Sequence, residues 1–482
     1  MKNIPVVIGV GTVQQKGSFD ELDEALVLMD LAFKKSLEDS TNPDIKNFID
    51  EIQTPKGFWR YRDPGRWVAE KNDISGVKTS IAKVGVLQQN LINSTCNKIV
   101  NGEIRAGLIL GGEARYKMLR AHLENKTYSE TELNINPDSY IKASDELQLE
   151  IEKNELGQMA VGYYALIESA LRASSNNDFV QYHKQIAKLY SEFSKIGSNN
   201  VDGWIEKPLT SHEILIQSKR NPLQAFPYNK YHCTSWNVNQ SCSMIICSES
   251  LADNLNIPKD KRVYPLASSE NNHMIAPIQR PNLIEPYGMK LAAKFILDIC
   301  KSNKITPNLY DLYSCFPVAV HMFSKSLNLD ISKNATITGG MPFAGGPLNS
   351  YVIHSTIKMI SKIRNDSSKV GIVTGVSGMM TKQSYALWSK NPEIEFAFKD
   401  FTDVAKNKEI PISLSKIDNG QGTVIGCTTI KNNNKYKAVI YLNCEDGNRK
   451  LITSSDESII KSMESEEWVK RKVYFKNNQL VY

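Results

Sequence analysis

Residues 338–349 read TGGMPFAGGPLN and lead into the apolar run 351–360. The stretch holds two glycine pairs, Gly339–Gly340 and Gly345–Gly346. Because glycine has no Cβ, it permits tight turns and a close approach of the backbone to a ligand, and Pro347 suits the first turn of a helix. The stretch therefore predicts a sharp loop that opens a buried helix, whose free N–H groups can hold an anion or oxyanion. A plain glycine-rich turn is the alternative.

A second copy of this pattern occurs earlier in the chain. LINSTCNKI (residues 91–99) aligns with VIHSTIKMI (residues 352–360), and Gly85 then falls on the second glycine pair. After each copy comes a similar apolar stretch, RAGLILGG at 105–112 and KVGIVTGV at 369–376. The chain therefore contains an internal duplication of loop, helix, turn and strand.

The apolar stretches in both copies show no alternation of polar and apolar residues. Such strands are buried on both faces, as in an open sheet covered by helices. We therefore predict an α/β fold of two similar halves, packed about a pseudo-dyad with both loops at the centre. The two helices that open at Gly85 and Gly346 should lie buried between the halves.

Composition narrows the class of protein. A chain of 482 residues can bury a sizeable core and hold more than one domain. The net charge of +6 is spread along the chain, which does not indicate nucleic-acid binding. The eight cysteines have no C-x-x-C pair and no metal spacing, which favours reduced thiols in a cytoplasmic protein without a metal. No segment has the length of a membrane span, and the N-terminal stretch reads as a strand.

The pattern of expected helices, strands and turns along the chain predicts three parts. The first half spans residues 1–258 and carries a long insertion, 113–234, which should shape the mouth of a substrate site. The second half spans 259–398. Short β-type runs separated by Asn, Gly and Lys turns then predict a separate, barrel-like domain at 399–482, and its removal should leave the core folded.

Two further stretches are candidate ligand contacts. FWRYRD at 58–63 combines aromatic rings with arginines, so it can grip a phosphate or stack on a base. The same residue types also favour packing at a domain edge. Asn237 stands where a strand begins at the predicted central cleft; its amide can orient a ligand or cap a turn.

The order of these elements resembles the thiolase superfamily, in particular the sterol-carrier-protein-type thiolases and the thiolase-like proteins related to them. The resemblance covers essentially the whole chain. It implies the duplicated thiolase fold (layered αβαβα) with an appended C-terminal β domain, and acyl transfer on coenzyme A. The stretches that carry it are IPVVIGVG (4–11), GEIRAGLILGGEA (102–114), DLYSCFP (311–317), TGGMPFAGGPLNSY (338–351) and GQGTVIGCTTI (420–430).

The resemblance implies four catalytic groups, and this sequence departs from the family at each of them. Thiolases use an acylated cysteine, a Gly-His-Pro histidine, a second cysteine in a Cys-x-Gly loop, and a His-Asp-Cys-Phe or Asn-Glu-Ala-Phe motif. Here Gly85 stands at the nucleophile, Met341 at the histidine and Thr374 at the second cysteine. The fourth motif has become Tyr313-Ser-Cys315-Phe.

Two interpretations of function follow. The first is a thiolase-like acyl-CoA protein of lipid metabolism, related to acetyl-CoA acetyltransferase, in which Cys315, Tyr313 or Ser314 takes over the chemistry. The second is a non-catalytic acyl-CoA binding or partner protein. A methionine cannot act as a base, and the loss of thiolate and base together removes the covalent route.

The resemblance also implies ligands and partners. Coenzyme A or acyl-CoA is the expected ligand, held without a covalent bond. The expected contacts are Asn237, Gly339, Gly340 and Gly345. A dimer through the core is one expectation, which the appended domain could block.

Overall fold

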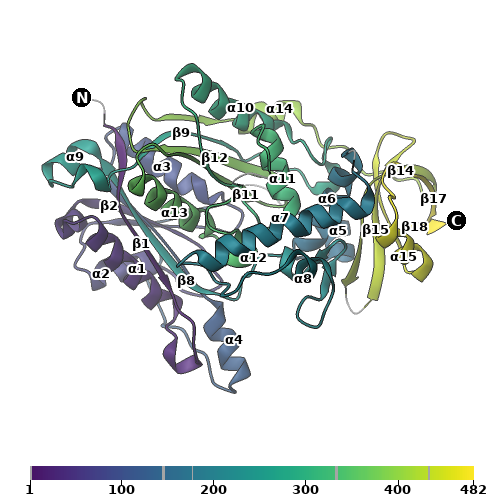
Figure 1. Ribbon diagram of the computed structural model, residues 1–482, viewed down its shortest axis with the longest axis horizontal. Helices are drawn as coiled ribbons and strands as arrows, with labels where there is room; N and C mark the ends of the chain where they lie inside the picture. Colours follow the sequence, from purple (N-terminus) through teal and green to yellow (C-terminus); the bar gives the residue numbers. More distant parts are fainter. Residues whose placement is uncertain (1–2, 144–146, 176, 332–334, 433–434, 482) are drawn as a thin grey trace.

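The computed structural model describes residues 3–143, 147–175, 177–331, 335–432 and 435–481 (Figure 1). The chain builds three sheets, with helices packed between and around them. The first sheet has six strands, in the order β1 (Pro5–Gln14), β8 (Asn239–Ser248), β4 (Ala106–Ala114), β2 (Ile49–Pro55), β3 (Lys78–Ala82) and β5 (Ser139–Ile141). Its helices are α1 (Ala25–Asp39), α2 (Pro64–Lys71), α3 (Gln88–Val100), α4 (Arg115–Leu123) and α9 (Glu249–Asn254).

The second sheet has five strands. Their order is β10 (Leu309–Asp311), β11 (Val370–Ser377), β12 (Lys382–Ser389), β9 (Tyr264–Asn271) and β13 (Ala397–Asp400). The helices of this half are α10 (Tyr287–Ser302), α11 (Pro317–Ser326), α12 (Met341–Ala344), α13 (Tyr351–Asn365) and α14 (Thr402–Lys408). The two apolar stretches predicted to be buried on both faces form β4, buried along its whole length, and β11, buried except at its two ends. Strands β8, β9 and β12 are buried along their whole length as well.

The two sheets confirm the internal duplication. The order β1-β8-β4-β2 of the first sheet recurs as β9-β12-β11-β10 in the second. In both halves the first two pairings are antiparallel and the third is parallel. Helices α3 and α13 contact each other, and the backbone N–H of Val352 donates to Gln88 Oε1 at 2.6 Å. The α/β fold class and the central helix pair are therefore confirmed, with the helices beginning at Gln88 and Tyr351, just beyond the glycines.

The insertion between β4 and β8 is largely helical. It contains α5 (Glu150–Leu156), α6 (Val161–Ser174), α7 (Phe179–Asn199), α8 (Ser211–Leu215) and the short strands β6 (Leu223–Ala225) and β7 (Tyr228–Asn229). Helix α7 packs against α12, and α6 packs against both α11 and β14. Figure 1 shows α6 between the two-sheet core and the C-terminal strands. The insertion therefore joins the second half to the last part of the chain.

The C-terminal strands close into a five-stranded barrel, as predicted. They are β14 (Asn419–Asn432), β15 (Lys435–Cys444), β16 (Arg449–Ser454), β17 (Lys472–Lys476) and β18 (Gln479–Val481), with α15 (Glu457–Ser465) between β16 and β17. The order β15-β16-β18-β17-β14 closes because β14 also pairs with β15. Val424, Ile440, Ile452, Trp468 and Phe475 belong to a hydrophobic cluster inside it.

The barrel also shares its other face with the rest of the protein. Strand β14 pairs with β6 of the insertion through Ile430 and Ala225. Ile430, Val439, Tyr441 and Leu451 belong to the hydrophobic cluster of the main core. Strand β13 and helix α14, at the start of the predicted third domain, pack on the second half. The division into 1–258, 259–398 and 399–482 stays a prediction.

Among the helices of the described residues, none combines the length and the apolar character that crossing a membrane requires.

Candidate functional site

The glycine-rich loop before α13 is held in place by one buried carboxylate. Asp311 ends β10 and is 1% exposed. It accepts hydrogen bonds from two backbone N–H groups and four hydroxyls: Ile337 N (2.9 Å), Thr338 N (3.1 Å), Thr336 Oγ1 (2.7 Å), Thr338 Oγ1 (3.0 Å), Tyr351 OH (3.2 Å) and Ser355 Oγ (2.6 Å). A buried carboxylate is tolerated only when such donors replace water. Asp311 therefore links the loop, β10 and the first turns of α13.

Three of the predicted thiolase positions lie around this loop. The backbone N–H of Tyr313 donates to Thr374 Oγ1 at 2.8 Å. The ring of Tyr313 packs edge-on against that of Tyr351, with 5.8 Å between the ring centroids. The N–H of Met341 donates to Ser314 Oγ at 3.0 Å. The structure thus brings Tyr313, Met341 and Thr374 together, and these three side chains include no thiol, imidazole or carboxylate.

The register of the histidine position is set by the helices. Met341 begins the short helix α12, whereas Gly345, Gly346 and Pro347 lie between α12 and the turn at 348–350 that leads into α13. Gly346 is therefore the counterpart of Gly85 in the duplicated fold. Neither Gly340-Met341-Pro342 nor Gly345-Gly346-Pro347 contains a histidine. The predicted absence of the base is therefore the same whichever of the two is aligned with the Gly-His-Pro motif.

Cys315 is the thiol nearest to these groups. It is 8% exposed, and Phe316, the residue after it, stacks on the ring of Tyr164 at 4.5 Å. Burial raises the pKa of the Cys315 thiol to about 12. Because the thiolate is the nucleophile, burial disfavours the reactive form of Cys315. Cys96, in α3, is fully buried, and its pKa is raised by burial as well.

Gly85 lies in the turn between β3 and α3. Its φ is +101°, a conformation that favours glycine. The buried ammonium of Lys382 donates to the carbonyl of Gly85 at 3.0 Å. A Cβ at Gly85 would lie 2.9 Å from the methyl group of Ala143. Ala143 of the insertion thus packs against Gly85, the predicted nucleophile position.

The other glycines of the central loop are also packed against the chain itself. A Cβ at Gly339 would lie 2.3 Å from Gly197 Cα, and one at Gly340 would lie 2.8 Å from the ring of Phe193. At Gly345 it would lie 2.4 Å from Gln240 Oε1. Each glycine therefore has a packing reason, because α7 and the start of β8 leave no room for a side chain. Ligand contact by these glycines stays a prediction.

Asn237 belongs to a different cluster. Its Oδ1 accepts from Arg115 Nε at 3.3 Å. The guanidinium of Arg115 contacts the rings of Phe58 and Trp236, at 4.1 and 4.4 Å from their centroids, and the two rings pack edge-on against each other. Two residues earlier, the backbone of Ser235 hydrogen-bonds Met341 and Gly346. The backbone near Asn237 therefore lies beside the central loop. Its side chain instead contacts Arg115, next to the 58–63 stretch.

Sequence reasoning missed Asp311 and Lys382. Asp311 begins the DLYSCFP motif, and a lone acidic residue at the end of an apolar strand was the available signal. Lys382 carries no local signal, because only the pairing of β12 with β11 brings it to Gly85. Within the described residues, no group of three or more His, Cys, Asp or Glu side chains could hold a metal ion.

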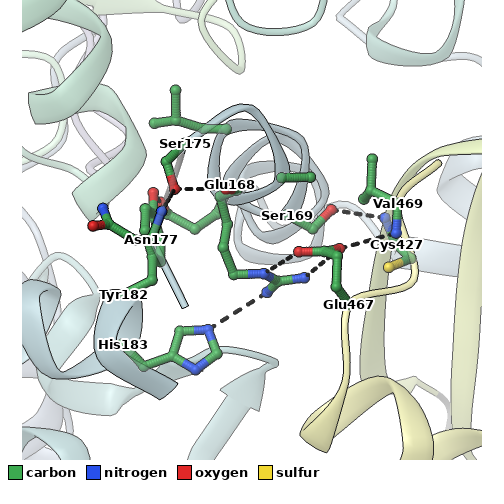
Figure 2. A network of polar contacts seen from close by, with 12 residues as sticks. Glu168, Ser169, Ser175, Asn177, Tyr182, His183, Cys427, Glu467 and Val469 are labelled. Atoms are coloured by element: carbon green, nitrogen blue, oxygen red, sulfur yellow. Dashed lines mark hydrogen bonds and ion pairs between the residues drawn. The ribbon is translucent and has the colours of Figure 1, made fainter. Parts of the chain in front are cut away.

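A second buried polar network joins the insertion to the barrel (Figure 2). Glu168 of α6 is fully buried and accepts hydrogen bonds from the hydroxyls of Tyr182 and Tyr228. One turn further along α6, Arg172 forms an ion pair with Glu467 of the barrel at 2.8 Å. His183 Nε2 lies 3.4 Å from Arg172 Nη1, and Figure 2 labels His183 and Glu467 in this network. Burial and the positive charge of Arg172 lower the pKa of His183 to about 3, so the ring is neutral there.

Glu168 is expected to make stability pH-dependent. Burial raises its pKa from 4.5 to about 7, so the folded state holds the proton more tightly than the unfolded state. Stability from this group is present below pH 4.5 and is lost as the pH rises to about 7. The free energy of unfolding of the wild type minus that of Glu168→Gln should therefore fall by about 2–3 kcal/mol between about pH 5 and about pH 8. Urea unfolding at both pH values measures this.

The control is Glu457→Gln on the exposed first turn of α15, for which the difference should stay constant. A constant difference for Glu168→Gln as well would show that Glu168 is ionised in the folded protein throughout.

Comparisons with known proteins find relatives by structure only. A scan against protein-family models finds no match, and neither does a search of curated proteins. A monomeric SCP2-thiolase-like protein type 1 from Mycobacterium smegmatis matches with a TM-score of 0.81 and 21% identity, over 99% of this chain and 98% of that chain. A thiolase from Ascaris suum in complex with coenzyme A matches with a TM-score of 0.54 and 14% identity, over 80% of this chain and 100% of that chain. An acetyl-CoA acetyltransferase from Syntrophomonas wolfei matches with a TM-score of 0.52 and 14% identity, over 81% of this chain and 100% of that chain.

The structural matches agree with the duplicated arrangement of the two sheets. The two thiolase matches each cover about four fifths of this chain, and the Mycobacterium protein matches it nearly from end to end. At these identities the likeness concerns the fold. The protein therefore has the duplicated thiolase fold and, over its whole length, the architecture of an SCP2-thiolase-like protein.

Proposed function

We propose that this chain is a thiolase-like protein of lipid metabolism that binds coenzyme A or acyl-CoA and does not carry out thiolase turnover. The observation that carries the proposal is the set of residues at the thiolase positions, Gly85, Met341 and Thr374, in a core that keeps the thiolase fold. Binding of coenzyme A is supported by the fold and by the solved complex of a structural neighbour.

The chemistry of these residues supports the loss of turnover. Thiolase turnover needs a thiolate, a base and a second proton carrier. Glycine offers no nucleophile and methionine offers no base, and Thr374 Oγ1 already accepts a hydrogen bond from the N–H of Tyr313. Cys315, the thiol that could replace the lost one, is buried with a pKa near 12. An acyltransferase that has recruited Cys315 is therefore the less supported alternative.

A direct test uses the purified chain with acetyl-CoA and acetoacetyl-CoA. We expect no acylated peptide by mass spectrometry and no thiolysis above the uncatalysed rate, whereas calorimetry should detect binding of coenzyme A or acyl-CoA. Gly85→Cys alone should not restore turnover, because the base and the second cysteine are missing too. An acyl group on the peptide that contains Cys315 would contradict the proposal, and so would the absence of any binding.

The remaining expectations on location and partners are part of the same proposal. We place the protein in the cytoplasm, which is supported by the eight cysteines, all of them free. Its partner would be a small acyl-CoA molecule. The structural neighbour of nearly equal length is monomeric, which supports a monomer over the core-to-core dimer.

A further inference from the structure

A cavity of about 440 Å³ lies between three segments that are far apart in the sequence. The connection from β2 to α2 forms one wall, the end of β3 the second, and β5 with the residues before it the third. Its volume falls in the range of about 300–1,000 Å³ that is typical of small-molecule sites. We call it the cation pocket, because its lining includes four cations beside two other polar side chains: Lys56, Arg60, Arg62, Lys83, Asn136 and Tyr140.

Carboxylates act on the cations of the pocket only from beyond ion-pair distance, as Glu130 and Glu113 do on Lys56. Within the residues that the structure describes, Lys56, Arg60, Arg62 and Lys83 form no ion pair. The nearby carboxylates of Glu113 and Glu130 are engaged by backbone N–H groups, those of Phe58 (2.9 Å) and Arg60 (2.8 Å). Four like charges around one cavity repel each other, and an anion inside it would relieve that repulsion.

Aromatic rings hold two of these cations in place. The ammonium of Lys56 lies 3.9 Å from the centroid of Trp59, and that of Lys83 lies 4.3 Å from the centroid of Tyr140. The carbonyl of Lys56 accepts a hydrogen bond from Asn349, at the start of α13. Burial, assisted by the charge of Lys83, lowers the pKa of Lys56 to about 8 despite the opposing charges of Glu130 and Glu113. Packing therefore positions Lys56 and Lys83, and the carboxylates of Glu130 and Glu113 offset part of the charge of Lys56.

The pocket also offers a surface for a flat ring. Tyr140 is 39% exposed, so part of its ring is open to a ligand, and the amide of Asn136 can donate and accept hydrogen bonds beside it. The pocket adjoins the central loops, because Lys83 lies two residues before Gly85. Its shape and charge thus suit a molecule with a polyanionic part and a planar part.

We propose that the cation pocket binds the diphosphate and base of a nucleotide, with the phosphates on Arg60, Arg62, Lys56 and Lys83 and the base beside Tyr140. Arginine suits this role because its planar fork of donors matches phosphate oxygens. A free nucleoside diphosphate and the nucleotide end of coenzyme A both present this chemistry. Only the coenzyme A source rests on the proposed function.

The test is calorimetry of the full chain with four probes: ADP, coenzyme A, adenosine and pantetheine. ADP should bind, and adenosine and pantetheine, which lack the diphosphate, should bind at least about tenfold more weakly. The double variant Arg60→Gln/Arg62→Gln should lose about tenfold or more of the affinity for ADP, because a hydrogen bond to a charged group contributes about 1.5–3 kcal/mol. Lys83→Gln is a second, single-site variant at an exposed side chain.

The matched control is Lys195→Gln/Lys461→Gln, which removes two exposed charges outside the pocket and should leave the affinity unchanged. If ADP binds as expected and coenzyme A does not, the pocket is confirmed and the proposed function fails. If coenzyme A binds with the same affinity in all variants while ADP does not bind, the proposed function stands and this proposal is overturned. Equal binding of ADP and adenosine, or no binding of either, also overturns it.

Discussion

Replacement of Asp311 by alanine is expected to lower the free energy of unfolding by about 4 kcal/mol or more. The side chain is buried and receives two backbone N–H groups and four hydroxyl hydrogen bonds. Without it the N–H of Ile337 and the hydroxyls of Tyr351 and Ser355 lose an acceptor, while the N–H of Thr338 keeps Thr336 Oγ1 at 3.2 Å. Each buried group left unsatisfied costs about 1–3 kcal/mol. The glycine-rich loop should also lose its anchor to α13. Urea unfolding followed by circular dichroism measures the change.

Two further variants sharpen this experiment. Asp311→Asn keeps the shape and one acceptor oxygen, so its loss should lie between those of the wild type and the alanine variant. Asp298→Ala removes an exposed aspartate that pairs with Lys294 in the same helix, and it should cost less than about 1 kcal/mol. A loss of that small size for Asp311→Ala would mean that the donors around Asp311 find other acceptors or water.

A chain that ends at Lys408 is expected to lose its cooperative fold. This truncation keeps β13 and α14 on the second half but removes the barrel that covers α5 and α6. Four side chains of the main core go with it: Ile430, Val439, Tyr441 and Leu451. At about 1.5–3 kcal/mol for each buried side chain, the loss is about 6–12 kcal/mol, comparable with the whole stability of a typical domain.

Polar contacts between the barrel and the insertion would also be lost in the truncated chain. Glu152 of α5 would lose the hydroxyl of Tyr441 at 2.6 Å, and Arg172 would lose its ion pair with Glu467. The measurement is a thermal melt and size-exclusion chromatography of the truncated and full chains. A monodisperse truncated chain with a melt within a few degrees of the full protein would contradict the expectation. That outcome would instead support the independent domain at 399–482 that the sequence alone predicts.

Local pattern was enough for the parts of the fold that repeat. The match of LINSTCNKI with VIHSTIKMI and the apolar runs after each copy predicted two similar halves with a buried helix pair, because burial on both faces leaves its mark in every residue of a strand. The barrel-like C-terminal part was predicted from short β-type runs separated by Asn, Gly and Lys turns. The loss of the thiolase groups stays a prediction of the sequence, based on the absence of a cysteine near Gly85 and of a histidine in 338–349 in any register.

Local pattern was not enough for the surroundings of the central loop. Gly339 and Gly345 read as ligand-binding glycines, yet the atoms against them belong to Gly197 and Gln240 of distant elements. A glycine needed for close packing and a glycine needed for ligand approach look the same in a sequence, since both only require the absence of a Cβ. Which of the two holds depends on what the fold brings to the open side.

What the sequence by itself determined is the α/β fold class, the duplication of its two halves and the barrel-like C-terminal part. Only the tertiary structure decided that the insertion packs into the central loops, that β6 extends the barrel sheet, and that Lys56, Lys83 and Tyr140 line one pocket. The physical reason is range. Periodicity and turn chemistry act between residues a few positions apart, whereas these contacts join segments whose separation in sequence leaves no periodic trace.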